Sequence, residues 1–158
     1  MSGQTVVDEA VFASFVAEAE PRLRRALVAL RGPEDGRDAT AEALAWAWQN
    51  WDRVADMDNP IGYLFRVGQS RSRRRLEGHL PIADPHGRSP YVEPGLAPAL
   101  ALLSDTQRTV VILVHGCDFT YTEVADALDI SKSSVGTHLR RAMTRLRAAL
   151  DVEEDHDA

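Results

Sequence analysis

The sequence has few of the features that stabilise secreted or membrane proteins. Cys117 is the only cysteine among 158 residues, which excludes an internal disulfide and is typical of a reducing cytoplasm. No apolar run approaches the roughly 20 residues that a membrane-spanning helix needs. The N-terminal residues MSGQTVVDEA contain neither the basic nor the apolar segment of a secretory signal. We therefore expect a cytoplasmic protein that is not inserted in a membrane.

Motifs of the common enzyme classes are missing as well. The chain has no glycine-rich phosphate loop, no nucleophile elbow and no HExxH sequence. The cysteine and the histidines follow no zinc-binding spacing; the histidines are His79, His86, His115, His138 and His156. We expect no enzymatic activity, no cofactor and no metal site, and we interpret Cys117 as a small buried residue.

Positive charge is scarce overall but concentrated in two places. The net charge is −6, yet Arg66–Arg75 carries five arginines and Lys132–Arg147 carries one lysine and four arginines, with no acid in either stretch. Removing these ten cations from the net charge of −6 leaves −16 for the rest of the chain. Basic stripes on an acidic protein indicate a polyanionic partner that is bound at defined places. Two solvated helix faces are the simpler alternative.

The first part of the chain has helical periodicity. Apolar residues recur every three or four positions from Phe12 to Leu30, and Pro21 within this run predicts a kink or a break. The sequence RGPEDGRD at 31–38 predicts a loop, because it is rich in glycine and proline. Asp38 at its end predicts the N-cap of a second helix.

Asn59 and Pro60 predict the start of a further helix, with asparagine as the cap and proline at the first helical position. We expect it to reach about Leu76, with an inward face of Ile61, Leu64, Val67 and Gly68. The next stretch, 78–95, contains four prolines and is typical of an extended linker. The fold class expected is all-α, with two small helical domains and a tail: 8–77, the linker 78–95, 96–150, and the acidic tail 151–158.

The C-terminal half carries three helix-start signals. Ser104 with Gln107, and Thr120 with Glu123, each have the spacing of a capping box. The first box opens a helix that ends at Gly116, and the second opens a helix expected to bury Tyr121, Val124, Ala125 and Leu128. Ser131 then caps a third, basic helix after a short turn. Two short helices joined by a tight turn, the second one basic, are typical of a helix-turn-helix that binds DNA.

The basic helix has two distinct faces. Apolar residues from Val135 to Leu150 fall on one side, and polar residues fall on the other. The N-terminal turns of a recognition helix meet base edges in the major groove. The candidate contacts with bases and phosphates are Lys132, Ser133, Ser134, Thr137, His138, Arg140 and Arg141. Gly136 interrupts this face, and glycine in a helix interior destabilises the helix by about 1 kcal/mol relative to alanine. A close approach of another backbone would explain why glycine is present here.

The two halves together resemble a bacterial sigma factor of the extracytoplasmic-function type, which keeps only regions 2 and 4 of the sigma-70 family. "LLSDTQRTVVILVHGCDFTYTEVADALDISKSSVGTHLRRAMTRLRAAL" is similar to region 4, and "GRDATAEALAWAWQNWDRV" with "NPIGYLFRVGQSRSRRR" is similar to region 2. The sequence departs from the family pattern at Ala41, Ser70, Arg73, Asp129 and Gly136. Response-regulator output domains share part of the region 4 pattern, so the order of the two halves makes the resemblance specific.

The resemblance implies a division of labour between the halves. Region 4 would read the −35 promoter element, and region 2 would open the −10 element. An arginine-rich helix beside exposed aromatics, here Tyr63 and Phe65, suits unstacked bases. The −10 candidates are Tyr63, Arg66, Ser70, Arg71, Arg74 and Arg75. The candidates for binding core RNA polymerase are Asp38, Glu42 and Trp48.

The implied function is that of a promoter-specificity subunit whose partners are core RNA polymerase and promoter DNA. Two alternatives stay open. The chain could be a stand-alone helix-turn-helix regulator that has lost polymerase binding, or an interaction module that binds an anti-sigma factor. The sequence also leaves open whether an anti-sigma factor regulates a functional sigma factor.

Overall fold

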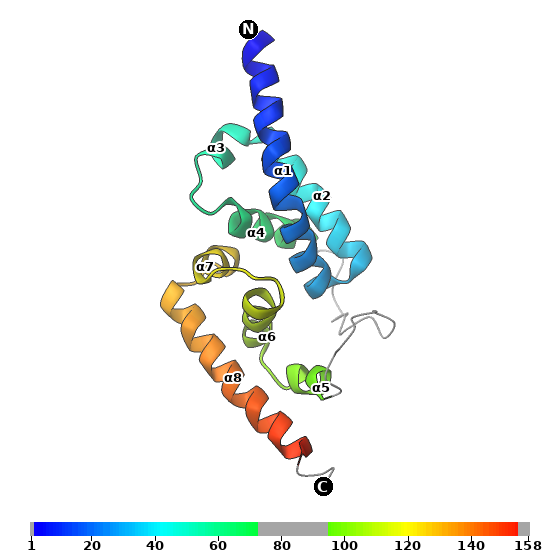
Figure 1. Cartoon of the computed structure of the whole chain (residues 1–158), viewed down its shortest axis with the longest axis vertical. Helices are drawn as coiled ribbons and strands as arrows, with labels where there is room; N and C mark the ends of the chain where they lie inside the picture. The colour runs from blue at the N-terminus through cyan, green and yellow to red at the C-terminus, as the bar shows by residue number, and fades with distance from the viewer. Residues whose placement is uncertain (1, 73–94, 155–158) are drawn as a thin grey trace.

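The computed structural model describes residues 2–72 and 95–154, and every regular element in these ranges is a helix (Figure 1). The predicted all-α fold is therefore confirmed. None of these helices is long and apolar enough to span a bilayer. The elements are α1 (Ser2–Arg31), α2 (Pro33–Gln49), α3 (Trp51–Ala55), α4 (Pro60–Ser72), α5 (Leu96–Ala101), α6 (Asp105–Val111), the π-helical turn η2 (Ile112–Gly116), α7 (Tyr121–Leu128) and α8 (Lys132–Glu154).

The predicted break at Pro21 is wrong, because α1 continues through this residue to Arg31. Pro21 lies on the exposed side of the helix, while Ala19, Leu23 and Ala26 beside it are fully buried. Packing of that apolar face compensates for the backbone hydrogen bond that a proline cannot donate.

The predicted loop at 31–38 is also wrong, because a single residue separates α1 from α2. Gly32 has φ 87° and reverses the chain, and α2 begins at the next residue with proline in its first turn. A positive φ suits glycine, and proline suits the first turn of a helix. Asp38 is therefore not an N-cap; it lies on the exposed side of α2 within its second turn. The turn is tight enough that a Cβ on Gly36 would lie 2.5 Å from the backbone of Val28.

The helix predicted to start at Pro60 is confirmed as α4, which the structure describes as far as Ser72. Ile61, Leu64 and Gly68 are buried as expected. Most of the predicted linker lies outside the described residues. The short helix α5, which follows it, was not predicted, because LAPALA has no N-cap signal and contains a proline.

Both predicted capping boxes are present. Ser104 accepts a hydrogen bond from the Gln107 amide at 3.2 Å, and Thr120 accepts one from the Glu123 amide at 3.1 Å; in each box the side chain of the later residue binds back to the cap. The helix opened by Ser104 ends at Gly116 through η2, as predicted. The basic helix is longer than expected, because α8 continues through Asp151 to Glu154 and takes in the first part of the acidic tail.

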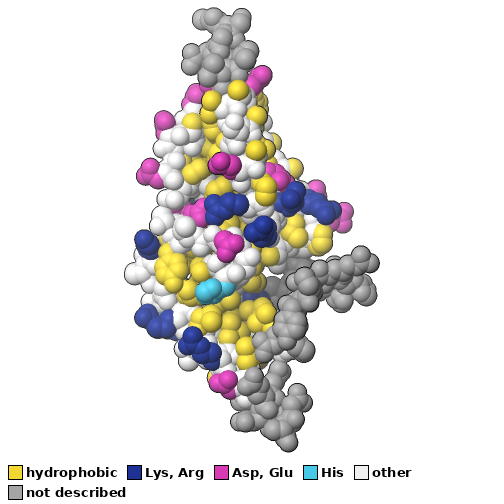
Figure 2. Space-filling view, viewed as in Figure 1, with side chains coloured by type: hydrophobic (Ala, Val, Ile, Leu, Met, Phe, Trp, Pro, Cys, Tyr) yellow, Lys and Arg dark blue, Asp and Glu magenta, His cyan; other side chains and the backbone are white. Residues whose placement is uncertain are grey.

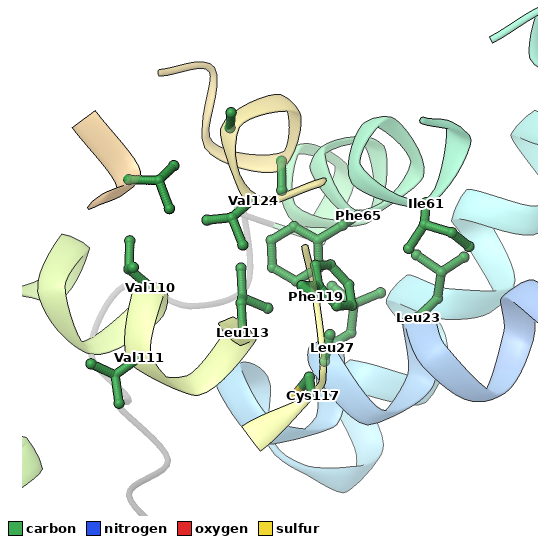
Figure 3. Close-up of a cluster of buried hydrophobic side chains, with 14 of the residues drawn as sticks. Leu23, Leu27, Ile61, Phe65, Val110, Val111, Leu113, Cys117, Phe119 and Val124 are labelled. Atoms are coloured by element: carbon green, nitrogen blue, oxygen red, sulfur yellow. The ribbon is translucent and has the colours of Figure 1, made fainter. Parts of the chain in front are cut away.

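The two halves of the chain share one core (Figure 3). Phe65 of α4 meets Phe119, which precedes α7, with ring centroids 6.0 Å apart and an angle of 78° between the planes. Leu23 and Leu27 of α1 and Leu113 of η2 complete this buried cluster, and none of the three is exposed. Helix α4 packs against α7, and the two lie side by side in Figure 1. The halves that the sequence separates by a linker are thus in direct contact.

An ion pair crosses the same boundary. The Arg22 guanidinium donates to both carboxylate oxygens of Glu123, each at 2.7 Å, and also to the carbonyl oxygen of Asp118 at 3.3 Å. The Arg22 side chain is 35% exposed and that of Glu123 only 10%. Arg22 also lies over the ring of Phe119, 5.3 Å from its centroid. A bidentate pair of this kind fixes the orientation of the two side chains relative to each other as well as stabilising their contact.

Backbone contact brings α4 and α7 still closer. A Cβ on Gly62 would lie 2.4 Å from the carbonyl oxygen of Glu123 and 3.0 Å from the Cβ of Asp126. Only a residue without a side chain fits at this crossing.

Glu123 is held in its ionised form. Burial alone would raise the pKa of its carboxyl group, but hydrogen bonds from Arg22 and from the Thr120 amide, together with the charge of Arg22, outweigh burial and lower that pKa below its ordinary value of 4.5. Because the folded pKa is lower than the unfolded one, the stabilisation is present above the ordinary pKa. It is lost as the pH falls through the folded pKa.

We predict that Arg22→Ala lowers the free energy of unfolding by about 2 kcal/mol, because it leaves the buried Glu123 carboxylate without its cation. Urea titration of the full chain measures this change. Arg24→Ala is the matched control: Arg24 is exposed and pairs with Glu20 on its own helix at 2.8 Å, so its loss should cost less than about 0.5 kcal/mol. Equal effects from the two substitutions would contradict the role of the Arg22–Glu123 pair.

A second prediction concerns pH. Unfolding free energy should fall more steeply in the wild type than in Glu123→Gln as the pH drops from about 6 to about 3.5, because only the wild type must protonate this carboxylate. Glutamine still fits the capping box. Urea titrations at a series of pH values compare the two chains, and superimposable pH profiles would rule out the pKa assignment.

Candidate nucleic-acid interface

The C-terminal half has the geometry of a helix-turn-helix. Helix α7 ends at Asp129, which adopts the left-handed conformation with φ 55°. The next amide, that of Ile130, bonds back to the carbonyl of Ala125 at 3.1 Å. Ser131 then caps α8 by accepting from the Ser134 amide at 3.1 Å. The turn is therefore closed by backbone bonds, and aspartate takes the position that usually requires glycine.

Helix α8 has a buried and an exposed side, as its sequence predicted. Val135, Leu139, Ala142 and Leu146 are buried against the helices of this half. Arg140, Arg141, Thr144, Arg145 and Arg147 are exposed. Dark-blue side chains lie over α8 along the lower left edge of the surface in Figure 2.

The first turns of α8 carry the residues predicted to meet base edges. Lys132 and Ser133 are exposed, and Ser134, Thr137 and His138 are half-buried. The hydroxyls are partly committed within the helix: Ser131 donates to Ser134 at 2.8 Å, and Thr137 donates to the carbonyl of Ser133 at 3.1 Å. Lys132 and His138 have no such bond within the described residues. The Lys132 and His138 side chains are therefore the groups of this face most available to a partner.

The cations further along α8 are available too. Within the described ranges, Lys132, Arg140, Arg141 and Arg147 form no ion pair, and Arg145 makes only a long hydrogen bond of 3.5 Å to Gln107. Arg140, Arg141 and Arg145 line a shallow groove with Gln107 and Thr144. Unpaired guanidinium groups along one groove suit a row of phosphates.

The structure corrects the prediction for Tyr121, which was expected in the core. Tyr121 is 39% exposed, because it is the first residue of α7 and its ring lies beside Gly136 of α8. A Cβ at position 136 would lie 3.9 Å from Cε2 of Tyr121, which is an ordinary contact distance. No close backbone approach within the described protein therefore explains Gly136.

The candidates on α4 form a smaller cluster in which rings and cations alternate. The guanidinium groups of Arg53 and Arg66 lie 5.5 Å and 5.0 Å from the centroid of the Tyr63 ring, and Tyr63 in turn packs on Trp46 at 5.4 Å. Arg53, on α3, was not predicted, because it is distant from the arginine-rich stretch in the sequence. Ser70 and Arg71 are exposed at the far end of α4, whereas Arg73, Arg74 and Arg75 lie outside the described residues.

Two findings modify the interpretation of α4. Phe65, predicted as an exposed aromatic, is fully buried because the second half covers this face of the helix. Arg66 points toward the same boundary and pairs with Asp129 of the helix-turn-helix at 3.4 Å. One of the predicted DNA-binding cations of α4 is thus engaged by the other half of the chain.

The residues predicted to bind polymerase lie on α2. Asp38 and Glu42 are one turn apart and both exposed, with the exposed Ala41 between them. Trp48 is 42% exposed, but at 1.5 Å per residue it lies about 9 Å beyond Glu42 and about 15 Å beyond Asp38 along the helix. Its ring packs on Phe12 of α1 at 4.9 Å, beside Phe15 and Trp51. The structure therefore brings the two carboxylates together and places the tryptophan in a separate aromatic cluster.

Cys117, His115 and His138 are the cysteine and histidines that the structure describes. In the described part of the chain, no three His, Cys, Asp or Glu side chains come close enough to hold a metal ion. Cys117 is buried, and burial raises the pKa of its thiol to about 11.

Comparison with known proteins assigns the chain to a family. Residues 99–148, from α5 to near the end of α8, match the family described as Sigma-70, region 4. The chain is 33% identical over 147 residues to the RNA polymerase sigma-E factor of Streptomyces avermitilis, which covers 86% of this chain and 82% of that protein. The chain belongs to the sigma-70 family of RNA polymerase sigma factors. The sigma-E factor of Streptomyces antibioticus is 32% identical over 137 residues, covering 77% of this sigma factor and 74% of the relative.

Solved structures share the fold of this sigma factor. The sigma factor RpoE in complex with the anti-sigma factor NepR from Bartonella quintana aligns with a TM-score of 0.70 and 22% identity, over 89% of this chain and 97% of that one. CnrH in complex with the cytosolic domain of CnrY aligns with a TM-score of 0.62 and 23% identity, over 91% and 90%. The predicted resemblance to an extracytoplasmic-function sigma factor is confirmed.

We predict that replacing Arg140 and Arg141 with alanine weakens DNA binding and flattens its dependence on salt. The slope of log K against log salt should fall by about 0.9 for each phosphate that the variant no longer neutralises. Titration of a duplex with the full chain and core polymerase at several salt concentrations measures the slope. Arg24→Ala with Arg37→Ala is the control, because it removes two exposed cations from α1 and α2. An unchanged slope in the Arg140 and Arg141 variant would exclude both residues from the interface.

Proposed function

We propose that this sigma factor binds core RNA polymerase and directs transcription initiation, with α8 reading the −35 promoter element and α4 contacting the −10 element. The observation that carries the proposal is the exposed basic face of α8. It belongs to a helix-turn-helix in the region that matches sigma region 4, and its cations form no ion pair with the rest of the described chain. An acidic protein that leaves these groups unpaired can offer them to phosphates. This role places the protein in the cytoplasm and requires no catalysis of its own.

Helix α4 and its neighbours supply groups suited to an opened strand. Tyr63 and Trp46 offer ring faces for unstacked bases, and Arg53 with Arg66 supplies charge beside them. Stacking on aromatic side chains contributes about 1–3 kcal/mol per base and tolerates any sequence. Ser70 and Arg71 extend this surface to the end of α4, and Arg74 and Arg75, which follow them in the sequence, are proposed as further contacts. Binding energy from such contacts would favour the melted state, and the polymerase would perform the chemistry.

We propose that residues 8–77 and 96–150 act as separate DNA-binding units that move apart on the polymerase. The linker 78–95, fully extended at about 3.3–3.6 Å per residue, could span about 60 Å, or about 17 base pairs at 3.4 Å each. The contact between α4 and α7 keeps the units adjacent and engages Arg66 with Asp129. Simultaneous contact with two separated promoter elements therefore requires this boundary to open.

Regulation by an anti-sigma factor fits the same arrangement. Two structural relatives were solved as complexes, RpoE with the anti-sigma factor NepR and CnrH with the cytosolic domain of CnrY. A partner that binds the packed arrangement better than the separated one would shift the population toward it. We propose such a partner for this chain as well.

The exposed carboxylates of α2 are the proposed contact with core polymerase. We predict that Asp38→Ala with Glu42→Ala lowers affinity for core polymerase by at least about ten-fold, because the variant cannot form two charge-assisted hydrogen bonds. Glu9→Ala with Glu18→Ala removes the same charge from exposed positions on α1 and should leave affinity unchanged. Run-off transcription from a cognate promoter and a pull-down with core polymerase provide the measurements.

The outcomes separate the candidate functions. Promoter-dependent transcripts from the wild-type chain support the proposal. DNA binding that is independent of core polymerase, with no transcripts, supports a stand-alone regulator. Tight binding to a regulatory protein without either activity supports an interaction module. Full retention of the Asp38 and Glu42 variant by core polymerase would exclude those two residues from the polymerase contact.

A further inference from the structure

The recognition face of α8 contains a shallow notch with Gly136 among its lining residues. Tyr121, from the start of α7, also lines it, and Leu139 and Met143 of α8 contribute apolar surface. Arg140 and Arg147 stand on its rim. This notch lies on the exposed side of α8, beside the residues proposed to contact DNA. Tyr121 is not one of those residues.

Gly136 is not required by the fold of the described protein. Gly36 and Gly62 lie so close to neighbouring backbone that a Cβ would come within 2.5 Å and 2.4 Å of it. At Gly136 the nearest atom to such a Cβ is Cε2 of Tyr121 at 3.9 Å, so alanine would fit without strain. Glycine in a helix interior costs about 1 kcal/mol relative to alanine. A longer side chain at this position would cover the Tyr121 ring, and glycine leaves the ring bare.

Two of the neutral polar groups around the notch are already hydrogen-bonded within the helix and its cap. The Thr144 hydroxyl donates to the carbonyl of Arg140 at 3.0 Å, and the Ser133 hydroxyl shares a hydrogen bond with that of Ser131 at 3.1 Å. A hydroxyl that donates to the backbone has only its lone pairs left to offer. Beside these two bonded hydroxyls and the phenol hydroxyl of Tyr121, the notch offers an aromatic ring and aliphatic carbon to an apolar group.

The charge on the rim identifies the kind of partner. Arg140 and Arg147 are exposed and form no ion pair within residues 2–72 and 95–154, so the partner that brings an apolar group into the notch is an anion. Thymine offers the C5-methyl group, which is the apolar feature of base edges in the major groove of DNA. A thymine within a phosphate backbone meets both requirements.

We infer that Tyr121 and Gly136 form a specificity-determining site that receives the methyl group of one thymine in the bound promoter. This inference rests on the proposed function. In this site Gly136 leaves the Tyr121 ring exposed, and the ring contacts the base. Arg140 and Arg147 hold the adjacent phosphates.

Deleting a single methyl group tests the inference. Duplexes bound by the full chain with core polymerase are first selected from a random-sequence pool. Each thymine of the selected duplex is then replaced in turn by uracil, which keeps the base pair and removes only the methyl. In the wild type, one replacement should weaken binding about four-fold, the value expected for one buried methyl group.

Protein variants assign the effect to the notch. Tyr121→Phe keeps the ring and should retain the four-fold sensitivity, while Tyr121→Ala and Gly136→Leu should lose sensitivity at that same position. Both positions lie at the surface, and circular dichroism and urea titration establish that the variants fold. Sensitivity that persists in Tyr121→Ala, or a wild type that responds to uracil at no position, overturns the inference. Loss of binding in Tyr121→Phe without any uracil effect also overturns it, because the hydroxyl would then be the contact.

Failure of the proposed function gives a different result. If no duplex is enriched with or without core polymerase, the chain does not read promoter DNA, and the notch has no thymine to receive. If duplexes are enriched but no methyl group matters, the sigma-factor function stands and only the thymine assignment falls.

Discussion

Glu123 binds two parts of the chain at once, and the arrangement of the two halves depends on it. Its carboxylate closes the capping box at the start of α7 and receives two guanidinium hydrogen bonds from Arg22 of α1. The first helix of the helix-turn-helix is therefore started and docked by the same side chain. Phe119, just before this cap, packs against Phe65 and under the Arg22 guanidinium. The contact between the halves therefore extends into the buried core.

This boundary also relates the two DNA-facing surfaces to each other. α8 presents its cations to solvent, whereas Arg66 on α4 pairs with the turn between α7 and α8. The bond from the Thr120 amide to Glu123 lies within the helix-turn-helix half, so separation of the halves would break the pairs of Glu123 with Arg22 and of Asp129 with Arg66 but not this bond. The buried aromatic contact is the part of the boundary that separation would expose to water. A partner that covers apolar surface on either half could therefore compensate for much of the cost.

Features determined by neighbouring residues in the chain were predictable, and features determined by distant residues were not. The two capping boxes, the turn at Asp129 and the inward face of α8 follow from spacings of a few residues. The burial of Phe65 and the exposure of Tyr121 depend on which helix covers each ring. The Arg22–Glu123 pair joins residues 101 positions apart, and no local pattern indicates it. The loop prediction at 31–38 failed because Gly32 alone reverses the chain, leaving Pro33 and the acids after it free to form a first helical turn. The separate DNA-binding roles of the two halves, and the individual contact residues, stay predictions.

The crossing of α4 over α7 at Gly62 has a consequence for how this fold can vary. The fit there leaves no room for even one methyl group against the Glu123 carbonyl, so any larger residue would act as a wedge at the centre of the boundary. The atoms that it would meet belong to Glu123 and Asp126 of α7, and none of them belongs to α8. A single added methyl group at position 62 could thus alter how readily the halves separate without changing any side chain that is proposed to contact DNA.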